Sequence, residues 1–346
     1  MQPGQGNDEQ GEGVSPFLAI LGSPAARFLY RRLSQAVVVM LVVVVGSFVL
    51  LQFAPGDMVD VLAGEADLTA EQMADLRARY GLDQPWPVQL LAYMGRLASF
   101  DLGYSPKLAA PVLDVLLQRM PVTLTLVALS VVISLSVGSF LGVMAARRAG
   151  SLLDMTISTA TLILYATPGF VVALGLIFFL SVKMRWLPTA GLTTVGADLR
   201  GMAWLVDVAR HLVMPVLALC TSYMAIYARL CRATMLEITS LDYIRTAWAK
   251  GLPERRVIFT HAFRNALLPL VTMAGLQVSA LLGGAVVVET LFGLQGMGRT
   301  AFDAVMERDV NMLLGVLFVC SFAVVIVNIC IDLLYVWLDP RVKVAA

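Results

Sequence analysis

The sequence predicts an all-α integral membrane protein with six transmembrane helices. Hydrophobic residues make up 59% of the 346 residues and charged residues only 14%, with a mean hydropathy of +0.81. An average soluble domain carries about 25% charged residues. A helix needs about 20 apolar residues to cross a hydrocarbon core of about 30 Å, and backbone groups in lipid must be paired locally. Six runs lack Asp, Glu, Lys and Arg: residues 33–56, 120–146, 155–182, 211–228, 265–288 and 310–331.

The first run predicts a retained membrane anchor. It is too long for the core of a cleaved signal peptide. We expect residues 27–56 to form the first transmembrane helix with a short interfacial segment before it, and residues 1–26 to form a disordered cytoplasmic tail. The fourth run is the shortest, so its helix must extend past Arg229, whose side chain can reach toward the interface.

Basic residues set the expected orientation. Arg27, Arg31 and Arg32 precede the first run, and Asp57 and Asp60 follow it. Cytoplasmic segments of membrane proteins carry an excess of Lys and Arg. With the N-terminus inside, the inner segments have a net positive charge and the outer segments a net negative charge. Both ends of the chain are therefore predicted to be cytoplasmic, and residues 57–119 to form a periplasmic lobe.

The periplasmic lobe is predicted to be folded. A capping box at residues 69–72 opens a polar helical stretch that reaches Tyr80, and Gly81 fits its end. Such a lobe is either a surface for a partner, a cover for a gate or a structured spacer.

The composition excludes several classes of site. The net charge of +1 offers no global basic surface for nucleic acid. Four cysteines without a CxxC pair and two histidines predict no disulfide framework and no metal site. The sequence contains no HExxH, no GxSxG and no paired intramembrane aspartates, so we assign no catalytic residues and do not expect an enzyme.

The cytoplasmic segment 229–264 carries a short amphipathic helix in its middle. Leu241, Ile244, Ala247 or Trp248, and Leu252 fall on one face at helical spacing. Asp242 suits the positive N-terminal end of the helix dipole, and Gly251 after Lys250 suits the stop. The apolar face needs a surface to cover it, which is either the inner leaflet or a groove in a cytoplasmic protein.

Helix-breaking and polar residues within the spans are candidates for a translocation path. They are Thr167, Pro168, Pro215, Gln277, Ser279 and Glu289. Helix packing is the alternative role for most of them, and an interfacial position is the alternative for Glu289. Gly138 and Gly142 form a small-xxx-small pattern typical of close helix packing. The scarcity of charge at membrane depth disfavours a proton- or sodium-coupled secondary transporter, although a six-helix secondary transporter or channel remains the alternative.

Several motifs occur in order along residues 27–342. They are PGD at 55–57, DLGYS at 101–105, DYIRTAWAKG at 242–251, RRV at 255–257, HAFRNALLP at 261–269, VVETLF at 287–292, GMGR at 296–299, DLLY at 332–335 and DPR at 339–341. Together they resemble binding-protein-dependent ABC importer permeases, most closely the "B"-type subunit of the dipeptide/oligopeptide/nickel family. The chain departs from the general signature because Arg245-Thr246-Ala247 replaces Glu-Ala-Ala, which resembles the peptide branch.

The resemblance implies a type I ABC importer transmembrane domain in the bacterial cytoplasmic (inner) membrane. Its permease core would span residues 120–342. The implied partners are a homologous second permease subunit, two cytoplasmic ATPase subunits, an extracytoplasmic substrate-binding protein and membrane lipid. ATP and Mg²⁺ would bind the ATPase subunits, and no cofactor would bind this chain directly. The substrate stays open among dipeptides, longer peptides, glutathione, opines and nickel chelates. The implied coupling residues are Asp242, Tyr243, Arg245, Thr246, Ala247, Trp248, Lys250, Gly251, Leu252, Arg255 and Arg256.

Overall fold

The computed structural model describes residues 24–53, 59, 69–79 and 81–338. Most of the predicted cytoplasmic tail lies outside these residues, as do the PGD motif at 55–57 and the DPR motif at 339–341.

Five helices in the described part of the chain are long and apolar enough to cross a membrane. They coincide with five of the six predicted runs, which confirms those predictions. The helices are α2 (Pro24–Phe53), α6 (Val112–Arg147), α9 (Met202–Thr239), α12 (Arg264–Leu291) and α14 (Val310–Leu338).

The remaining run forms two helices that meet at 99°. The first is α7 (Leu152–Ala166), and the second is α8 (Gly169–Leu176), which continues into the π-helical segment η1 (Ile177–Lys183). Proline disfavours helical backbone at the residue before it. Thr167 accordingly has φ −82° and ψ 123°, and Pro168 caps the start of α8. Helices α7 and α8 make a sixth span only if the two are counted together as one broken span.

The closest helix packing joins α6 to α9. A Cβ added at Gly138 would lie 2.6 Å from the carbonyl oxygen of Met224, and one at Gly142 would lie 2.6 Å from that of Ala228. Buried Ser130 and Ser134 continue the same stripe at four-residue spacing. The small-xxx-small prediction is therefore confirmed, and the stripe is longer than predicted.

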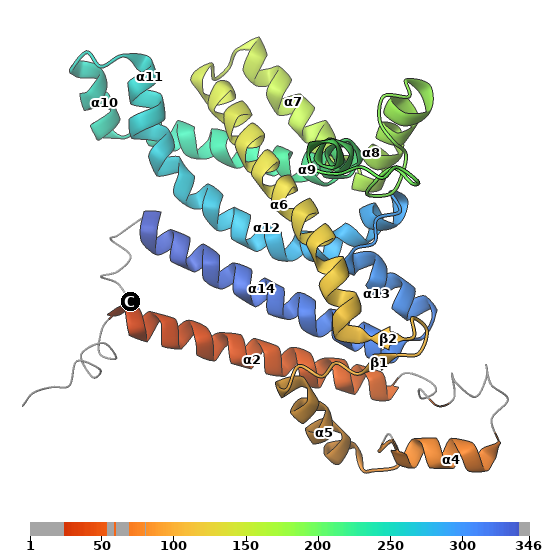
Figure 1. Ribbon diagram of the computed structural model, residues 1–346. Helices are drawn as coiled ribbons and strands as arrows, with labels where there is room; N and C mark the ends of the chain where they lie inside the picture. The colour runs from red at the N-terminus through yellow and green to blue at the C-terminus, as the bar shows by residue number, and fades with distance from the viewer. Residues whose placement is uncertain (1–23, 54–58, 60–68, 80, 339–346) are drawn as a thin grey trace, which may run out of the picture.

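The two ends of the bundle differ (Figure 1). One end holds α10 (Asp242–Ala249) and α11 (Glu254–Arg256), which the π-helical segment η2 (Val257–Phe263) joins to α12. The start of α2 and the end of α14 lie toward that end of the bundle (Figure 1). The opposite end holds α4 (Ala70–Arg79), α5 (Trp86–Ala98), a hairpin of β1 (Tyr104–Ser105) and β2 (Ala110–Pro111), and α13 (Met297–Met306).

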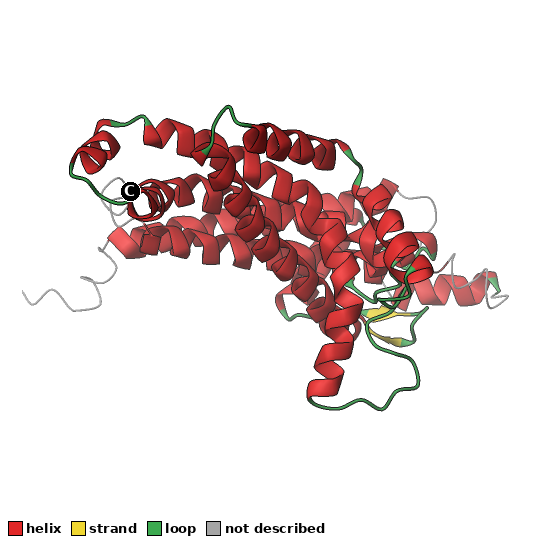
Figure 2. Cartoon of the chain, turned by 90° about the horizontal axis from the view of Figure 1, so that it is seen from above, coloured by secondary structure: helices red, strands yellow, loops and turns green. Residues whose placement is uncertain are grey.

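Helices make up most of the described chain, and the hairpin is the exception (Figure 2). Its strands pair antiparallel. The Ser105 hydroxyl donates a hydrogen bond to the buried Asp309 carboxylate, which also accepts from the Met312 N–H at 3.0 Å. Asp309 thereby attaches the hairpin to the start of α14.

The capping box is present as predicted. The Thr69 N–H donates to Gln72 Oε1 at 2.9 Å, and the Gln72 N–H donates to Thr69 Oγ1 at 3.4 Å. Gly81 follows α4 with φ +66°. Helices α5 and α13 and the hairpin were not predicted from the sequence.

Candidate functional site

The predicted cytoplasmic helix exists as α10. It begins at Asp242 and ends at Ala249, with Lys250 as the C-cap. Gly251 follows with φ +73°, a left-handed conformation that glycine adopts without a steric penalty. The predicted start and stop are confirmed to within a few residues.

The structure divides the predicted apolar face of α10 in two. Ile244 and Ala247 are buried in one cluster with Ile238, Val257 and Ile258, where Leu252 packs at the edge. Leu241, Tyr243 and Trp248 are exposed instead. Ala247 therefore packs against its own chain and does not lie on the exposed face. The exposed face is aromatic rather than small.

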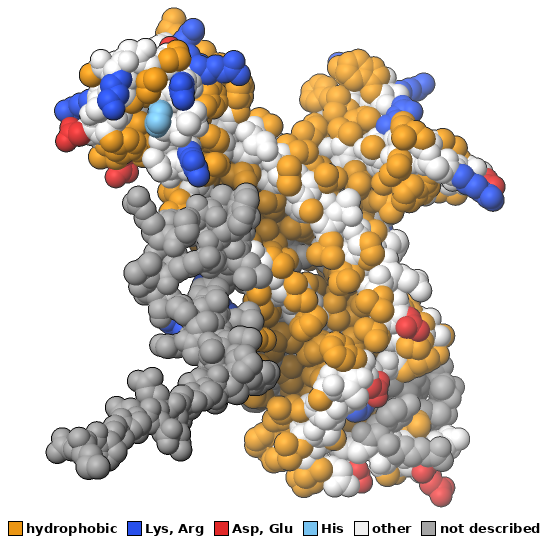
Figure 3. Space-filling view, turned by 60° about the vertical axis from the view of Figure 1, so that its left-hand side comes forward, with side chains coloured by type: hydrophobic (Ala, Val, Ile, Leu, Met, Phe, Trp, Pro, Cys, Tyr) orange, Lys and Arg blue, Asp and Glu red, His pale blue; other side chains and the backbone are white. Residues whose placement is uncertain are grey.

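Basic side chains surround this exposed face. Arg245, Lys250, Arg255 and Arg256 are all exposed, and Lys and Arg side chains gather over this end of the molecule (Figure 3). Arg245 lies 3.6 Å from Asp242, and the Thr246 hydroxyl donates to the Asp242 carbonyl at 2.9 Å. The face suits a partner surface with an apolar pocket and an acidic rim.

Polar contacts connect α10 and α11 to the long helices. The Asn265 side chain of α12 donates to the Tyr243 hydroxyl at 2.9 Å. Arg147 at the end of α6 forms a 2.8 Å ion pair with Glu254. These two contacts connect α10 and α11 to α12 and α6.

A second ion pair connects α7 with α9. The Arg232 guanidinium binds both carboxylate oxygens of Asp154, at 2.6 and 2.8 Å. Asp154 also accepts from the Gly150 N–H at 2.9 Å. This bidentate geometry is the strong form of an ion pair, so α7 and α9 are joined near the end that carries α10.

The predicted path residues do not share one environment. Pro215 and Gln277 are buried, and Gln277 is only 5% exposed. Gln277 Oε1 has no hydrogen-bond partner among the described residues. Thr167 and Ser279 are half-buried and Pro168 is exposed, and the Thr167 hydroxyl donates to the Ile163 carbonyl at 2.8 Å. Pro215 and Gln277 have positions typical of packing, whereas the bend at Pro168 is open.

Glu289 is fully buried near the end of α12. Its carboxylate accepts hydrogen bonds from the Thr123 hydroxyl at 2.6 Å and from the Arg299 N–H at 2.9 Å. Thr123 Oγ1 in turn accepts from the Met297 N–H at 2.8 Å. Glu289 thus binds the N-terminus of α13, which favours negative charge. Neither interfacial exposure nor access to solute describes this side chain.

Glycine makes this contact possible. A Cβ at Gly296 would lie 2.4 Å from Glu289 Cδ, and one at Gly298 would lie 2.8 Å from the Val286 backbone. Gly293 has φ +62°. The glycines of residues 293–298 therefore serve a tight turn and close packing.

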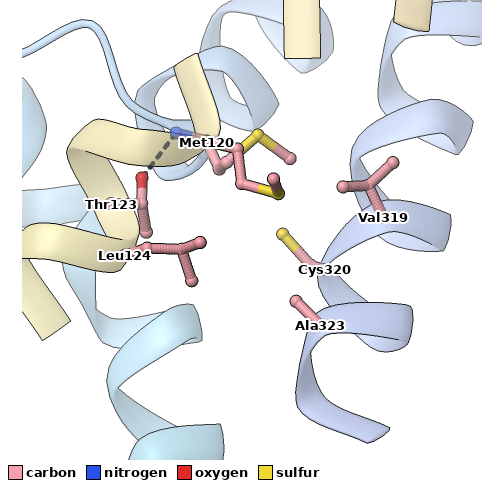
Figure 4. A pocket seen from close by; sticks show the side chains of 7 residues that line it. Met120, Thr123, Leu124, Val319, Cys320 and Ala323 are labelled. Atoms are coloured by element: carbon pink, nitrogen blue, oxygen red, sulfur yellow. Dashed lines mark hydrogen bonds between the residues drawn. The ribbon is translucent and has the colours of Figure 1, made fainter. Parts of the chain in front are cut away.

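A small pocket lies beside Thr123, between α6, α13 and α14 (Figure 4). In Figure 4 the Thr123 hydroxyl points toward the Met297 backbone, and the Met120 and Cys320 side chains face each other across the gap. Apart from Thr123 and Cys320 its lining is apolar, namely Met120, Leu124, Met297, Val319 and Ala323. It offers no charged group to a solute.

These features define a class: a polytopic helical membrane protein with a broken span and a basic, helix-bearing end. The family follows from comparison. The chain matches the model of the "Binding-protein-dependent transport system inner membrane component" over residues 138–344, and the N-terminal model of the same system over residues 25–127. The chain belongs to this family, which confirms the resemblance seen in the motifs.

Known proteins agree with this assignment. The chain is 37% identical to "Probable peptide ABC transporter permease protein y4tP" of Sinorhizobium fredii, over 91% of this chain and 99% of that protein. It is 36% identical to "Oligopeptide transport system permease protein AppB" of Bacillus subtilis, over 92% and 99%. A structure of the MetNI methionine ABC transporter in inward-facing conformations covers 66% of this chain and 98% of its own, with a TM-score of 0.53 and 18% identity. The fold is thus that of a type I ABC importer transmembrane domain.

Proposed function

We propose that this chain is the transmembrane permease subunit of an ATP-driven importer that moves peptides or similar small solutes inward across the bacterial inner membrane. It would act with a homologous second permease subunit, two cytoplasmic ATPase subunits and an extracytoplasmic binding protein. Family membership supports this assignment, as do the two relatives, whose names specify peptides and oligopeptides. Which peptide or related solute is carried depends mainly on the binding protein.

In the proposed orientation, α10 lies in the cytoplasm together with both ends of the chain. Arg245, Lys250, Arg255 and Arg256 all lie at the α10 end, and excess Lys and Arg is typical of the cytoplasmic side. The end with α4, α5, the hairpin and α13 would then face the binding protein.

The observation that carries the proposal is the two-faced geometry of α10. Its inner face, Ile244 and Ala247, is fixed to the bundle, while its outer face presents Leu241, Tyr243 and Trp248. In a membrane protein without ATPase partners, the inner leaflet would be the surface available to this Tyr–Trp face and its basic residues. Docked in a groove of an ATPase subunit, it would bury aromatic side chains of the kind that dominate binding energy.

Closure of the ATPase pair would pull α10 and, through it, the long helices. The Arg147–Glu254 ion pair and the Asn265–Tyr243 hydrogen bond connect α10 and α11 to α6 and α12. The connecting segment η2 is π-helical, and π segments inside helices often mark functional sites. ATP binding would thereby shift the population between inward- and outward-open states.

ATP hydrolysis is assigned to the partner subunits. The nearest likeness to a phosphate-binding loop, residues 293–300, has Arg299 where the Walker motif has Lys. That segment forms the turn before α13 and the first residues of α13, at the end of the bundle opposite α10 (Figure 1).

The test is purification of the complete transporter with a single change on the outer face of α10. Trp248→Glu is expected to reduce co-purification of the ATPase subunits and the ATPase activity that the permeases stimulate. Trp204→Glu is the matched control, because Trp204 is 44% exposed and Trp248 46%, and Trp204 lies in the first turn of α9. Intact coupling in Trp248→Glu would exclude the outer face of α10 as the docking element. A wild-type preparation that contains no ATPase subunits and still transports would favour a transporter that works without them.

A further inference from the structure

Arg229 of α9 places a positive charge within a spanning helix. Its guanidinium carbon lies 4.4 Å from the ring centroid of Tyr165 on α7. Both side chains are exposed on the surface of the chain, Tyr165 to 49%. No carboxylate of the described residues forms an ion pair with Arg229, whereas Arg232, one turn away, binds Asp154 in bidentate fashion.

The contact is displaced from the Asp154–Arg232 ion pair toward the bend at the end of α7. Tyr165 comes eleven residues after Asp154 on α7, a distance of about 16 Å along a helix axis at 1.5 Å per residue. Helical side chains tilt toward the helix N-terminus, so Arg229 leans toward the middle of α9. The guanidinium stacks on Tyr165 there.

A charge in this position rarely faces lipid. Arg within spanning segments almost always faces the interior of an assembly or a water-filled cavity, because exposure to hydrocarbon costs several kcal/mol. Tyr165 also lies two residues before the bend at Thr167 and Pro168, where α7 ends and α8 begins. The surface that carries Arg229 and Tyr165 is thus continuous with the open bend in the broken span.

We propose that Arg229, stacked on Tyr165, is a carboxylate-binding site in the translocation path of this permease. The planar guanidinium offers paired N–H donors that match a carboxylate. The Tyr165 ring holds it in place through the cation–π contact, and the phenol hydroxyl adds a further donor. The ligand class is a solute with a free carboxylate, such as the C-terminus of a peptide. This inference rests on the proposed import function.

The experiment compares uptake of one radiolabelled tripeptide with uptake of its C-terminal amide. The complete transporter is reconstituted in proteoliposomes with ATP, and both solutes are supplied at concentrations that saturate the binding protein. Wild type is expected to favour the acid over the amide. Arg229→Gln is expected to reduce that preference about tenfold or more, because Gln lacks the positive charge that strengthens hydrogen bonds to a carboxylate. Arg229→Lys is expected to retain part of it.

Changes at Tyr165 test the positioning role of the ring. Tyr165→Phe is expected to retain most of the preference, because the stacking ring remains, and Tyr165→Leu is expected to lose more. Arg200→Gln is the control for loss of a positive charge. Arg200 lies in an exposed loop, where it pairs with Asp198 at 3.2 Å, and its loss is expected to leave the preference unchanged.

Three outcomes would overturn the inference. Equal loss of acid and amide uptake in Arg229→Gln, or loss of the second permease subunit on purification, would assign Arg229 to subunit packing. If uptake depended on anionic lipid in wild type but not in Arg229→Gln, Arg229 would be assigned to binding a lipid headgroup phosphate. An unchanged preference would exclude the site altogether. Failure of the wild-type complex to take up either solute would instead contradict the proposed function.

Discussion

The buried carboxylate of Glu289 is predicted to hold the end of the bundle opposite α10 together. Replacement by Gln keeps the size of the side chain but turns one acceptor oxygen into an NH₂ donor. That group would then face either the Thr123 hydroxyl or the Arg299 N–H, which now donate to the two carboxylate oxygens at 2.6 and 2.9 Å. If the amide oxygen faced the Arg299 N–H, the Thr123 hydroxyl would accept from the amide NH₂ and lose the acceptor for its own hydrogen.

The expected cost follows from the donors left without an acceptor. A buried donor without a partner costs about 1–3 kcal/mol, so we expect Glu289→Gln to lower the free energy of unfolding by about that amount. Glu289→Ala leaves both donors unpaired and creates a void, so its cost should reach about 4 kcal/mol or more.

The assay is chemical denaturation of the detergent-solubilised chain, followed by tryptophan fluorescence. Glu307→Gln serves as the control, because Glu307 is exposed at the other end of α13. If Glu289→Gln and Glu307→Gln unfolded within about 0.5 kcal/mol of each other, the size expected for a surface change, the structural role of Glu289 would be refuted.

Three further predictions concern the α10 end and the packing of α6 on α9. Gly142→Ala should destabilise the chain by about 1–3 kcal/mol through overpacking. Gly175→Ala should not destabilise it, because a Cβ at Gly175 meets nothing within 4 Å. Chemical denaturation of both variants measures the difference. Asp154→Asn should lower the free energy of unfolding by about 2–3 kcal/mol because it leaves Arg232 without its carboxylate. The double variant Asp154→Asn/Arg232→Gln should lose less stability than the two single variants lose in sum. Ala247→Glu should lower the yield of folded protein on size-exclusion chromatography, since it places a charge in the cluster around Ile258; a folded but uncoupled variant would contradict this assignment.

The sequence was sufficient to predict most of the fold because lipid imposes simple rules. Charge-free runs of spanning length located five long helices and the broken sixth span. Gly138 and Gly142 indicated the α6–α9 contact because only small residues permit so close an approach. The motif resemblance led to the correct family, although no single motif defines it.

The faces of α10 could not be predicted from periodicity alone. Spacing placed Leu241, Ile244, Ala247 and Trp248 together, yet the structure buries only Ile244 and Ala247. Helical periodicity shows which residues share a face of an isolated helix. Which of those residues are buried depends on where α9 and η2 lie around α10. A short helix with apolar residues on most of its surface can present more than one apolar face.

The partners of Glu289 could not be predicted for a related reason. Its place near the end of a run indicated an interface, but its partners come from residues 123 and 299, which are distant in sequence. Gly296 and Gly298 were the sequence features that could have indicated this contact, because two glycines soon after a carboxylate permit the chain to fold back on it. The contact between Arg229 and Tyr165 likewise depends on the packing of α7 against α9 and leaves no pattern in the sequence.

The central claim is that ATP-driven motion enters this subunit through the outer face of α10. The most direct test is uptake of labelled peptide into proteoliposomes that contain ATP and both permease subunits, with the binding protein outside. We predict uptake when the ATPase subunits are present and ATP is hydrolysed, and its loss in Trp248→Glu while Trp204→Glu remains active. Peptide uptake by this chain alone, without nucleotide, would contradict the account.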